Sequence, residues 1–254
     1  MSDSSDSAPG PSPDGIPARP GLAGRSIAAL AAAALLFLVP LILFVLLAED
    51  VAEREVLPFD RPVMLWLHSG STPWLTAVME AVTQLGGLVV VPIAAVVVAT
   101  ALWRRGSRTN AVLLAAAVVG STALNSVLKA VFRRARPDFW EHLVTENSYS
   151  FPSGHAMATM SLAAALVVLA WGTRWRWATV MAGAVYVLAV GISRMYLGVH
   201  FPSDILAGWC VALAWVAVVV EVLRVVTARS RRSPGGAGSG ADDVGGPDAG
   251  RAPS

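Results

Sequence analysis

Long stretches without a charged residue alternate with short polar segments along most of this chain. A membrane-spanning helix needs about 20 mostly apolar residues, and the last three stretches are shorter but can borrow flanking residues. Because an open strand could not satisfy its backbone in lipid, we predict an all-α fold, an integral membrane bundle of six transmembrane helices. The six stretches are 26–48, 81–103, 109–128, 156–173, 177–193 and 205–220.

Three other segments have different patterns. Residues 59–82 mix Trp and Leu side chains with polar ones, which is typical of an interfacial helix lying on the membrane between spans one and two. Residues 1–25 and 230–254 are rich in Gly, Ser, Pro and Asp, and they hold too few apolar residues to form a core. We therefore expect two disordered tails around one membrane domain, residues 26–229.

The composition agrees with a membrane protein and excludes other classes. Hydrophobic residues make up 55% of the 254 and charged residues only 14%, whereas a soluble domain carries roughly a quarter charged residues. The net charge of +2 is too small for a nucleic-acid-binding surface. Cys210 is the only cysteine, so an intrachain disulfide and a multi-cysteine metal site are excluded, and ordinary packing is its expected role.

Arginine is distributed unevenly between the two predicted membrane faces. The face with both chain ends holds 11 basic residues, against 7 on the other face. Since cytoplasmic loops carry the excess of Lys and Arg, we expect both termini in the cytoplasm of a multi-pass plasma-membrane protein. The first group comprises Arg19, Arg25, Arg104, Arg105, Arg108, Arg174, Arg176, Arg224, Arg229, Arg231 and Arg232.

Polar residues that could carry chemistry form three clusters at the ends of predicted spans. Span four crosses the membrane and span five returns, so all three clusters lie on the same face. The arginine count makes this the outer face. Span three covers about 30 Å, which puts its end at the rim of the hydrocarbon. The clusters are Lys129, Arg133, Arg134, Arg136 and Pro137; Pro152, Ser153, Gly154 and His155; and Ser193, Arg194, His200 and Asp204.

Each cluster also has an ordinary structural explanation. Lys129 could be a snorkelling lysine at a helix end, and Arg133 and Arg134 could bind lipid headgroups. Ser153 could cap a helix, and Asp204 suits a helix N-terminus. These explanations do not say why cations, two histidines and an acid converge on one rim.

Together the clusters resemble the signature of the type 2 phosphatidic acid phosphatases, a superfamily of membrane lipid phosphatases. The sequence reads KAVFRRARP from Lys129, PSGH from Pro152 and SRMYLGVHFPSD from Ser193. All three parts match in order and in spacing, and the resemblance extends from about residue 60 to 226. His68 and His142 match no part, and we interpret them as interface or loop residues.

The resemblance implies how the histidines divide the reaction. His200 would attack phosphorus and form a phosphohistidine, while Asp204 would orient His200 and stabilise its developing charge. His155 would protonate the leaving oxygen as general acid. Spacing alone leaves the two histidines exchangeable.

The remaining motif residues are expected to bind phosphate, because phosphoryl transfer depends on positioning and charge stabilisation. Arg133 and Arg134, inside the spacer, could add contacts to a headgroup or a second phosphate. No cluster of carboxylates or cysteines is present to hold a metal, so we expect no metal and no cofactor. The expected phosphate ligands are Lys129, Arg136, Ser153, Gly154 and Arg194.

These observations predict a lipid phosphatase that acts on a lipid phosphate or diphosphate at the outer membrane face. Undecaprenyl diphosphate is the first candidate substrate, ahead of phosphatidylglycerol phosphate and phosphatidic acid. The expected partners are this lipid and the bilayer, with no nucleic acid and no obligate protein. Vanadate-dependent haloperoxidases resemble the same motifs but are soluble, and a transporter would carry its charges near the membrane midplane.

Overall fold

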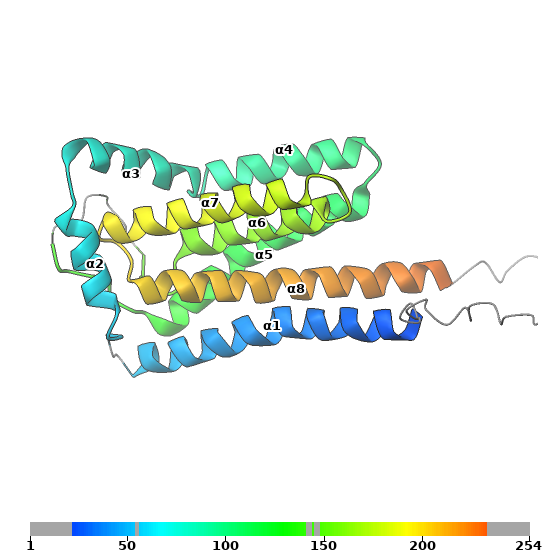
Figure 1. The fold of residues 1–254 in the computed structure, drawn as a ribbon, viewed down its shortest axis with the longest axis horizontal. Coiled ribbons are helices and arrows are strands. Elements are labelled where there is room, and N and C mark those ends of the chain that lie inside the picture. Colours follow the sequence, from blue (N-terminus) through cyan, green and yellow to red (C-terminus); the bar gives the residue numbers. More distant parts are fainter. Residues whose placement is uncertain (1–21, 54–55, 141–143, 145–147, 233–254) are drawn as a thin grey trace, which may run out of the picture.

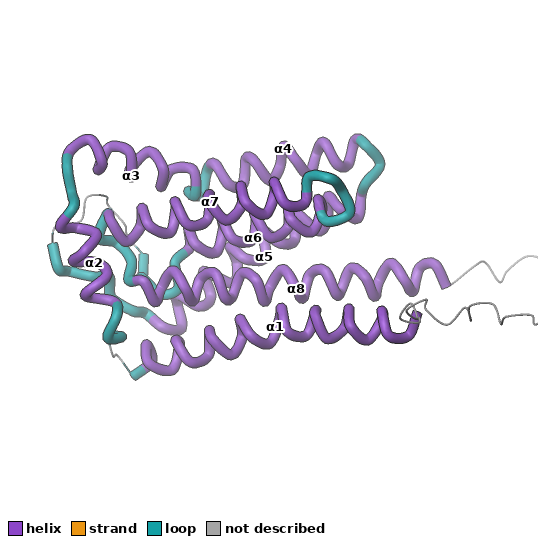
Figure 2. Tube along the Cα trace, viewed as in Figure 1, coloured by secondary structure: helices purple, strands orange, loops and turns teal. Residues whose placement is uncertain are grey.

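The computed structural model describes residues 22–53, 56–140, 144 and 148–232, and all regular structure in them is α-helical (Figures 1 and 2). Residues 1–21 and 233–254 of the predicted tails lie outside the described residues. The helices are α1 (Leu22–Ala52), α2 (Asp60–Ser69), α3 (Pro73–Leu85), α4 (Val90–Arg104), α5 (Arg108–Phe132), α6 (Gly154–Ala170), α7 (Arg176–Tyr196) and α8 (Pro202–Arg232).

The long helices run side by side, and α2 crosses one end of the bundle (Figure 1). Successive long helices alternate in direction, so Leu22 and Arg232 lie at the same end as the α4–α5 and α6–α7 turns. The other end, where α2 lies, holds the last residues of α5 and α7 and the first residues of α6 and α8. All three motifs therefore belong to the α2 end of the bundle.

Four helices are long and apolar enough to span a membrane on their own: α1, α5, α7 and α8. Helices α3 and α4 meet this test together, as a pair bent by 41°. The break between them contains Gly86 and Gly87, and a kink at glycine has an evident physical cause. The chain is therefore an all-helical membrane protein with four or five candidate spans. The fourth predicted span, residues 156–173, corresponds to the shorter apolar helix α6.

Helix α6 has 17 residues, which corresponds to about 25 Å. It packs against α5, α7 and α8 and also touches α4, so it is the central helix of the bundle. Its buried side chains are mostly small, and small residues let helix backbones approach closely in a membrane protein. They are Ala156, Met157, Ala158, Thr159, Ser161, Leu162, Ala163 and Ala165.

The segment 59–82, predicted as one interfacial helix, forms two helices instead. Helix α2 ends at Gly70, and Thr72 begins a new helix by accepting a hydrogen bond from the Leu75 backbone (3.4 Å), with Pro73 in the first turn. Proline suits that position because its missing N–H would have no helical partner there. Consequently α3 continues towards α4, and only α2 lies across the bundle end (Figure 1).

Helices α5 and α8 approach each other closely at Gly120. A Cβ atom added there would lie 2.1 Å from Cζ2 of Trp215, whose indole N–H donates to the Ala116 carbonyl (3.1 Å). The ring is thus held against the helix it packs on. A Cβ atom added to Gly172, in the α6–α7 turn, would have no neighbouring atom within 4 Å.

We therefore predict that Gly120→Ala destabilises the protein by about 1–3 kcal/mol, the usual cost of overpacking a filled interior. Gly172→Ala is the matched control and should leave stability unchanged. Thermal unfolding in detergent, followed by tryptophan fluorescence, measures both. Equal melting temperatures for the two variants would contradict the close α5–α8 contact.

Candidate active site

The innermost part of the site is the pair His200 and Asp204, on the α7–α8 connection and the first turn of α8. His200 is 1% exposed and Asp204 is fully buried. The ring nitrogen Nδ1 lies 3.4 Å from Oδ2 of Asp204, and Nε2 lies 3.4 Å from a terminal nitrogen of Arg136. One ring nitrogen thus faces an acid and the other faces a cation.

Asp204 is held by several donors. Its Oδ2 accepts from the Phe201 backbone N–H (2.9 Å) and from the Ser150 hydroxyl. Ser150 Oγ also lies 3.3 Å from Nδ1 of His200, so this serine touches both members of the pair. Ser150 lies two residues before Pro152, the first residue of the Pro-Ser-Gly-His motif, and its role was not predicted from the sequence.

Two of the predicted phosphate-binding cations are anchored by the loop before α6. Lys129 donates to the Ser148 hydroxyl (2.9 Å) and to the Tyr149 carbonyl (2.7 Å). Arg136 donates to the Ser148 carbonyl (2.9 Å) and to the Val199 carbonyl (2.7 Å). These bonds orient both cations at the end of α5 and bring the Arg136 guanidinium to His200.

The third cation, Arg194, is 2% exposed and comes from the last turn of α7. It donates to the Thr83 hydroxyl (3.0 Å) near the end of α3. Ser193 beside it bonds the Val190 carbonyl within the same helix (2.7 Å), which is a structural role. Arg194 therefore ties the bent α3–α4 pair to the site.

The Pro-Ser-Gly-His motif forms the start of α6. Ser153 caps the helix by accepting from the Ala156 N–H (3.4 Å), and its own N–H donates to the Asp204 carbonyl (3.1 Å). A Cβ on Gly154 would lie 3.0 Å from Oδ1 of Asn125, and one on Gly208 would lie 2.9 Å from the Ser153 carbonyl. Glycine at both positions lets the helix start pack tightly between α5 and α8.

His155 follows at the second residue of α6. A Cβ added to Gly87 would lie 3.9 Å from its Nε2, so the imidazole faces the α3–α4 break. The charge of His155 also lowers the pKa of His200. The structure thus brings together every site residue predicted from the three motifs.

Burial lowers the pKa of His200 well below its ordinary value of 6.5, and the nearby cations Arg194, Arg136 and Lys129 lower it further. Charging the ring would place another positive charge among them. Both effects favour the uncharged form of the His200 imidazole.

The sequence suggested that Arg134 binds a headgroup or a second phosphate, but in the structure its guanidinium pairs with acidic side chains instead. It is paired with two buried carboxylates, Asp60 on α2 (3.0 Å) and Asp204 (2.6 Å). Arg133 ends α5 in a left-handed conformation with φ 47°, so the two neighbouring arginines point differently. Asp60 was missed because, in sequence, it resembles the other acids of the loop after the first span.

The two histidines outside the motifs, His68 and His142, have different outcomes. His68, on α2, stacks on the ring of Trp140 with centroids 4.1 Å apart. His142 lies outside the described residues. Among the residues that are described, no group of three or more His, Cys, Asp or Glu side chains could hold a metal ion.

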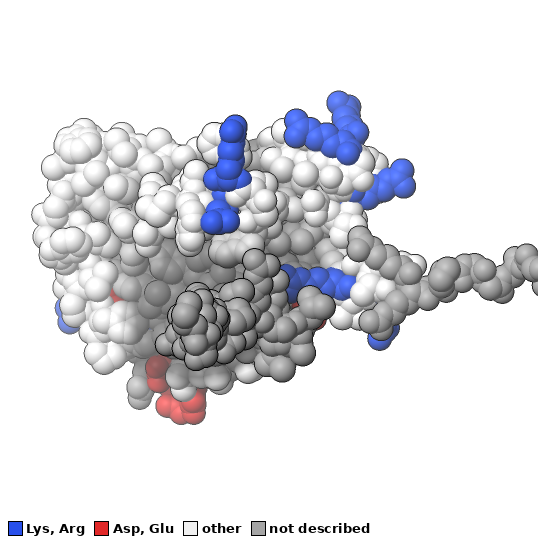
Figure 3. Space-filling model, turned by 45° about the vertical axis from the view of Figure 1, so that its right-hand side comes forward, with Lys and Arg blue, Asp and Glu red and all other residues white. Residues whose placement is uncertain are grey.

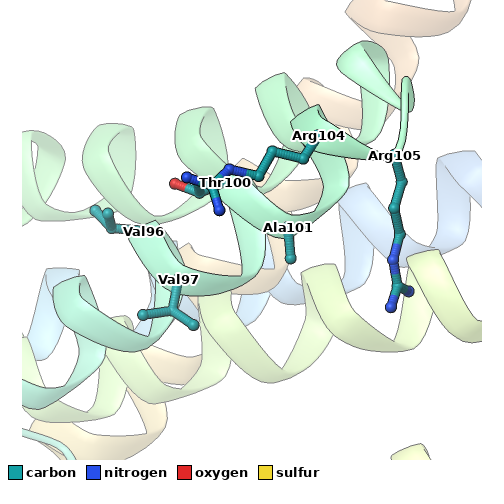
Figure 4. Close-up of a pocket in the computed structure, with 6 residues that line it drawn as sticks. All are labelled: Val96, Val97, Thr100, Ala101, Arg104 and Arg105. Carbon is teal, nitrogen blue, oxygen red and sulfur yellow. The ribbon is translucent and has the colours of Figure 1, made fainter.

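A hollow of about 540 Å³ lies on α4, towards its Arg104 end and away from these motifs (Figure 4). Val96, Val97, Thr100 and Ala101 line it, and the side chains of two arginines diverge beside it. None of its lining residues is an acid or a histidine. It therefore lacks the groups that phosphoryl chemistry needs.

Comparison with known proteins assigns the family. The model of the PAP2 superfamily matches residues 110–227. Phosphatidylglycerophosphatase B of Bacillus subtilis (strain 168) is 35% identical over 181 residues, which cover 67% of this chain and 86% of the relative. The chain belongs to the PAP2 superfamily. This confirms the family predicted from the three motifs.

Two further comparisons show the range of PAP2 relatives. Undecaprenyl-diphosphatase of Sulfolobus acidocaldarius is 36% identical over 69 residues, or 27% of this chain and 31% of that protein. The crystal structure of a transmembrane PAP2 type phosphatidylglycerolphosphate phosphatase from Bacillus subtilis superposes with a TM-score of 0.65 and 28% identity. The match covers 74% of this chain and 96% of that one. This PAP2 chain is therefore a membrane lipid phosphatase.

The lowered pKa of His200 can be measured directly. The chain has only four histidines, so ¹⁵N-histidine labelling gives a readable NMR titration in detergent. We predict a His200 midpoint below 6.5 that rises in Arg136→Gln, since one neighbouring cation is removed. Because the folded-state pKa is the lower one, the unfolded chain binds the extra proton, and stability falls as the pH drops below 6.5.

Arg108→Gln, at the opposite end of the bundle, is the control and should leave the His200 midpoint unchanged. A wild-type midpoint at or above 6.5 would contradict the conclusion that burial and the nearby cations lower the His200 pKa more than the facing carboxylate raises it.

Proposed function

We propose that this chain removes a phosphate from a lipid phosphate or diphosphate at the outer membrane face, through a phosphohistidine on His200. The observation that carries the proposal is the orientation of the buried imidazole. Nδ1 faces Asp204, and with the ring proton on that nitrogen the lone pair of Nε2 would lie beside the Arg136 guanidinium. A phosphate bound by that guanidinium would lie next to the nucleophile.

The reaction then takes two steps. Nε2 of His200 attacks phosphorus, the bond from phosphorus to the leaving lipid oxygen breaks, and His155 donates a proton to that oxygen. Asp204 stabilises the charge that develops on the ring. In the second step His155 accepts a proton from water, which attacks the phosphohistidine and releases inorganic phosphate.

The phosphate would be bound by cations and by a helix start. Lys129, Arg136 and Arg194 supply three positive charges, and two of them are planar guanidinium groups that suit phosphate oxygens. Ser153 and the amide of Gly154 lie at the N-terminus of α6, where the helix dipole favours an anion. These groups require no metal, so we propose a metal-independent reaction.

For the topology, we propose six spans, with α6 and the bent α3–α4 pair each crossing once and α2 lying at the interface. Most of the basic side chains visible in Figure 3 gather around the end with the α4–α5 and α6–α7 turns, and acidic ones lie towards the other end. By the positive-inside rule, the arginine-rich end with both termini is cytoplasmic. The active site then faces outside.

Two substrates have separate support. The outward-facing site of a compact chain favours undecaprenyl diphosphate, the substrate predicted from the sequence. The match to phosphatidylglycerophosphatase B, which spans 86% of that protein, favours phosphatidylglycerol phosphate. Values of kcat/KM for both lipids, measured side by side in mixed micelles, establish their order.

We predict that His200→Ala abolishes turnover of both lipids while the protein stays folded, because the nucleophile is lost. Wild-type enzyme quenched during turnover of ³²P-labelled substrate should carry acid-labile, base-stable label, and the variant should carry none. The assay is run in excess chelator, where wild-type activity should persist. Turnover by the variant within about tenfold of wild type would eliminate His200 as nucleophile, and loss of wild-type turnover in chelator would eliminate the metal-independent reaction.

The orientation predicts which introduced cysteines react in intact cells. Asp138→Cys, in the loop after α5, should react with a membrane-impermeant maleimide, whereas Thr173→Cys, in the α6–α7 turn, should react only after lysis. Both native side chains are exposed, and Cys210 within α8 provides the only other thiol. The reverse pattern would place the site in the cytoplasm and replace an outer-leaflet lipid by an inner-leaflet one.

A further inference from the structure

A second group of buried charges lies behind the His200–Asp204 pair. The guanidinium of Arg134 joins the carboxylates of Asp60 and Asp204 at 3.0 and 2.6 Å. The Arg134 side chain is only 9% exposed, and both acids are fully buried. Such a cluster is costly to desolvate unless each charge is compensated, so its place beside the proposed nucleophile requires an explanation.

The two oxygens of the Asp204 carboxylate have different partners, and Arg134 binds one of them. One oxygen, Oδ1, accepts from Arg134, while the other, Oδ2, accepts from the Phe201 backbone and faces Nδ1 of His200. With Oδ1 held, the carboxylate plane cannot rotate without breaking an ion pair. The oxygen that faces the imidazole is therefore fixed from the opposite side of the carboxylate.

Asp60 in turn holds Arg134. It accepts from the Arg134 guanidinium and, on its two oxygens, from the backbone N–H (2.9 Å) and the hydroxyl (2.7 Å) of Ser203. The ring of Phe201 covers the guanidinium with its centroid 4.1 Å from Cζ. Asp60 is the first residue of α2, so these bonds connect the helix that crosses the bundle end to the start of α8.

The cluster also supplies charge. Two carboxylates against one guanidinium leave a net charge of −1 behind His200. Attack on phosphorus makes the imidazole develop positive charge, which the surrounding cations oppose, as they do in lowering its pKa. A net negative cluster behind Nδ1 offsets that opposition, and removing Asp60 would make the cluster neutral.

We propose that Arg134 and Asp60 are positioning residues for the reaction. Arg134 fixes the Asp204 carboxylate, and Asp60 fixes Arg134 and makes the cluster negative. Neither is expected to touch substrate, because the Arg134 fork is directed at the two acids. The inference rests on the proposed role of His200 as nucleophile.

The test compares Arg134→Gln and Asp60→Asn with two exposed controls, Arg108→Gln and Asp138→Asn, which change the same residue types. Arg108 lies at the opposite end of the bundle, and Asp138 lies in the loop after α5. Both positioning variants should lose at least tenfold in kcat while KM for a short-chain lipid phosphate stays within threefold. Both controls should stay within twofold of wild type in both parameters.

A second measurement separates positioning from general damage. The ¹⁵N shifts of His200 report which ring nitrogen carries the proton, and wild type should carry it on Nδ1. Arg134→Gln should shift population towards the Nε2–H form, and inhibition by inorganic phosphate should stay within threefold, since Lys129, Arg136 and Arg194 are intact. If Arg134→Gln does not fold, Asp60→Asn, which keeps the size and an acceptor, carries the same test.

Three results would overturn the proposal: turnover within twofold of wild type in a folded positioning variant, a raised KM with unchanged kcat, or an unchanged His200 tautomer. The second would make Arg134 a substrate ligand. His200→Ala, assayed in parallel, keeps the two hypotheses apart. Full activity there removes the proposed nucleophile, whereas its inactivity together with active Arg134→Gln and Asp60→Asn removes only the positioning role.

Discussion

A buried carboxylate needs hydrogen-bond donors on both oxygens, and the active site of this phosphatase is arranged around that requirement at Asp204. One oxygen is held by Arg134 and the other by Ser150 and the Phe201 backbone. The carbonyl of the same residue receives the Ser153 N–H at the start of α6. Through these bonds Asp204 connects the segment after α5, the loop before α6, and α8, and the Arg134–Asp60 ion pair extends the connection to α2.

The membrane imposes the second constraint, because ionised groups are expensive in hydrocarbon. Here the cations and histidines of the three motifs collect at one end of the bundle, where α5 and α7 finish and α6 and α8 begin. The helix between them, α6, is short and lined with small buried residues. Its close packing brings the ends of α5 and α7 and the start of α8 together.

Groups of opposite charge lie on the two sides of the His200 imidazole, with Arg136 at Nε2 and Asp204 at Nδ1. The cations that we propose as phosphate ligands lower the pKa of His200, which in the proposed mechanism preserves its lone pair for attack. The same cations would oppose the charge that forms once attack begins. In our proposal the acidic groups on the far side of the ring, Asp204 and Asp60, offset that opposition.

Much of the protein follows from the sequence itself. Apolar length predicts the all-helical membrane fold, and the spacing in KAVFRRARP, PSGH and SRMYLGVHFPSD predicts the site, since helix ends and motif order place these residues on one rim. The division of 59–82 into two helices and the roles of Asp60, Ser150 and Arg134 needed the tertiary structure. Arg134 and Arg133 are indistinguishable in the chain, and only the left-handed turn at the end of α5 sends one outward and the other to two carboxylates distant in sequence. The local sequence pattern determines helix length and motif spacing, whereas long-range packing determines the partner of a buried charge.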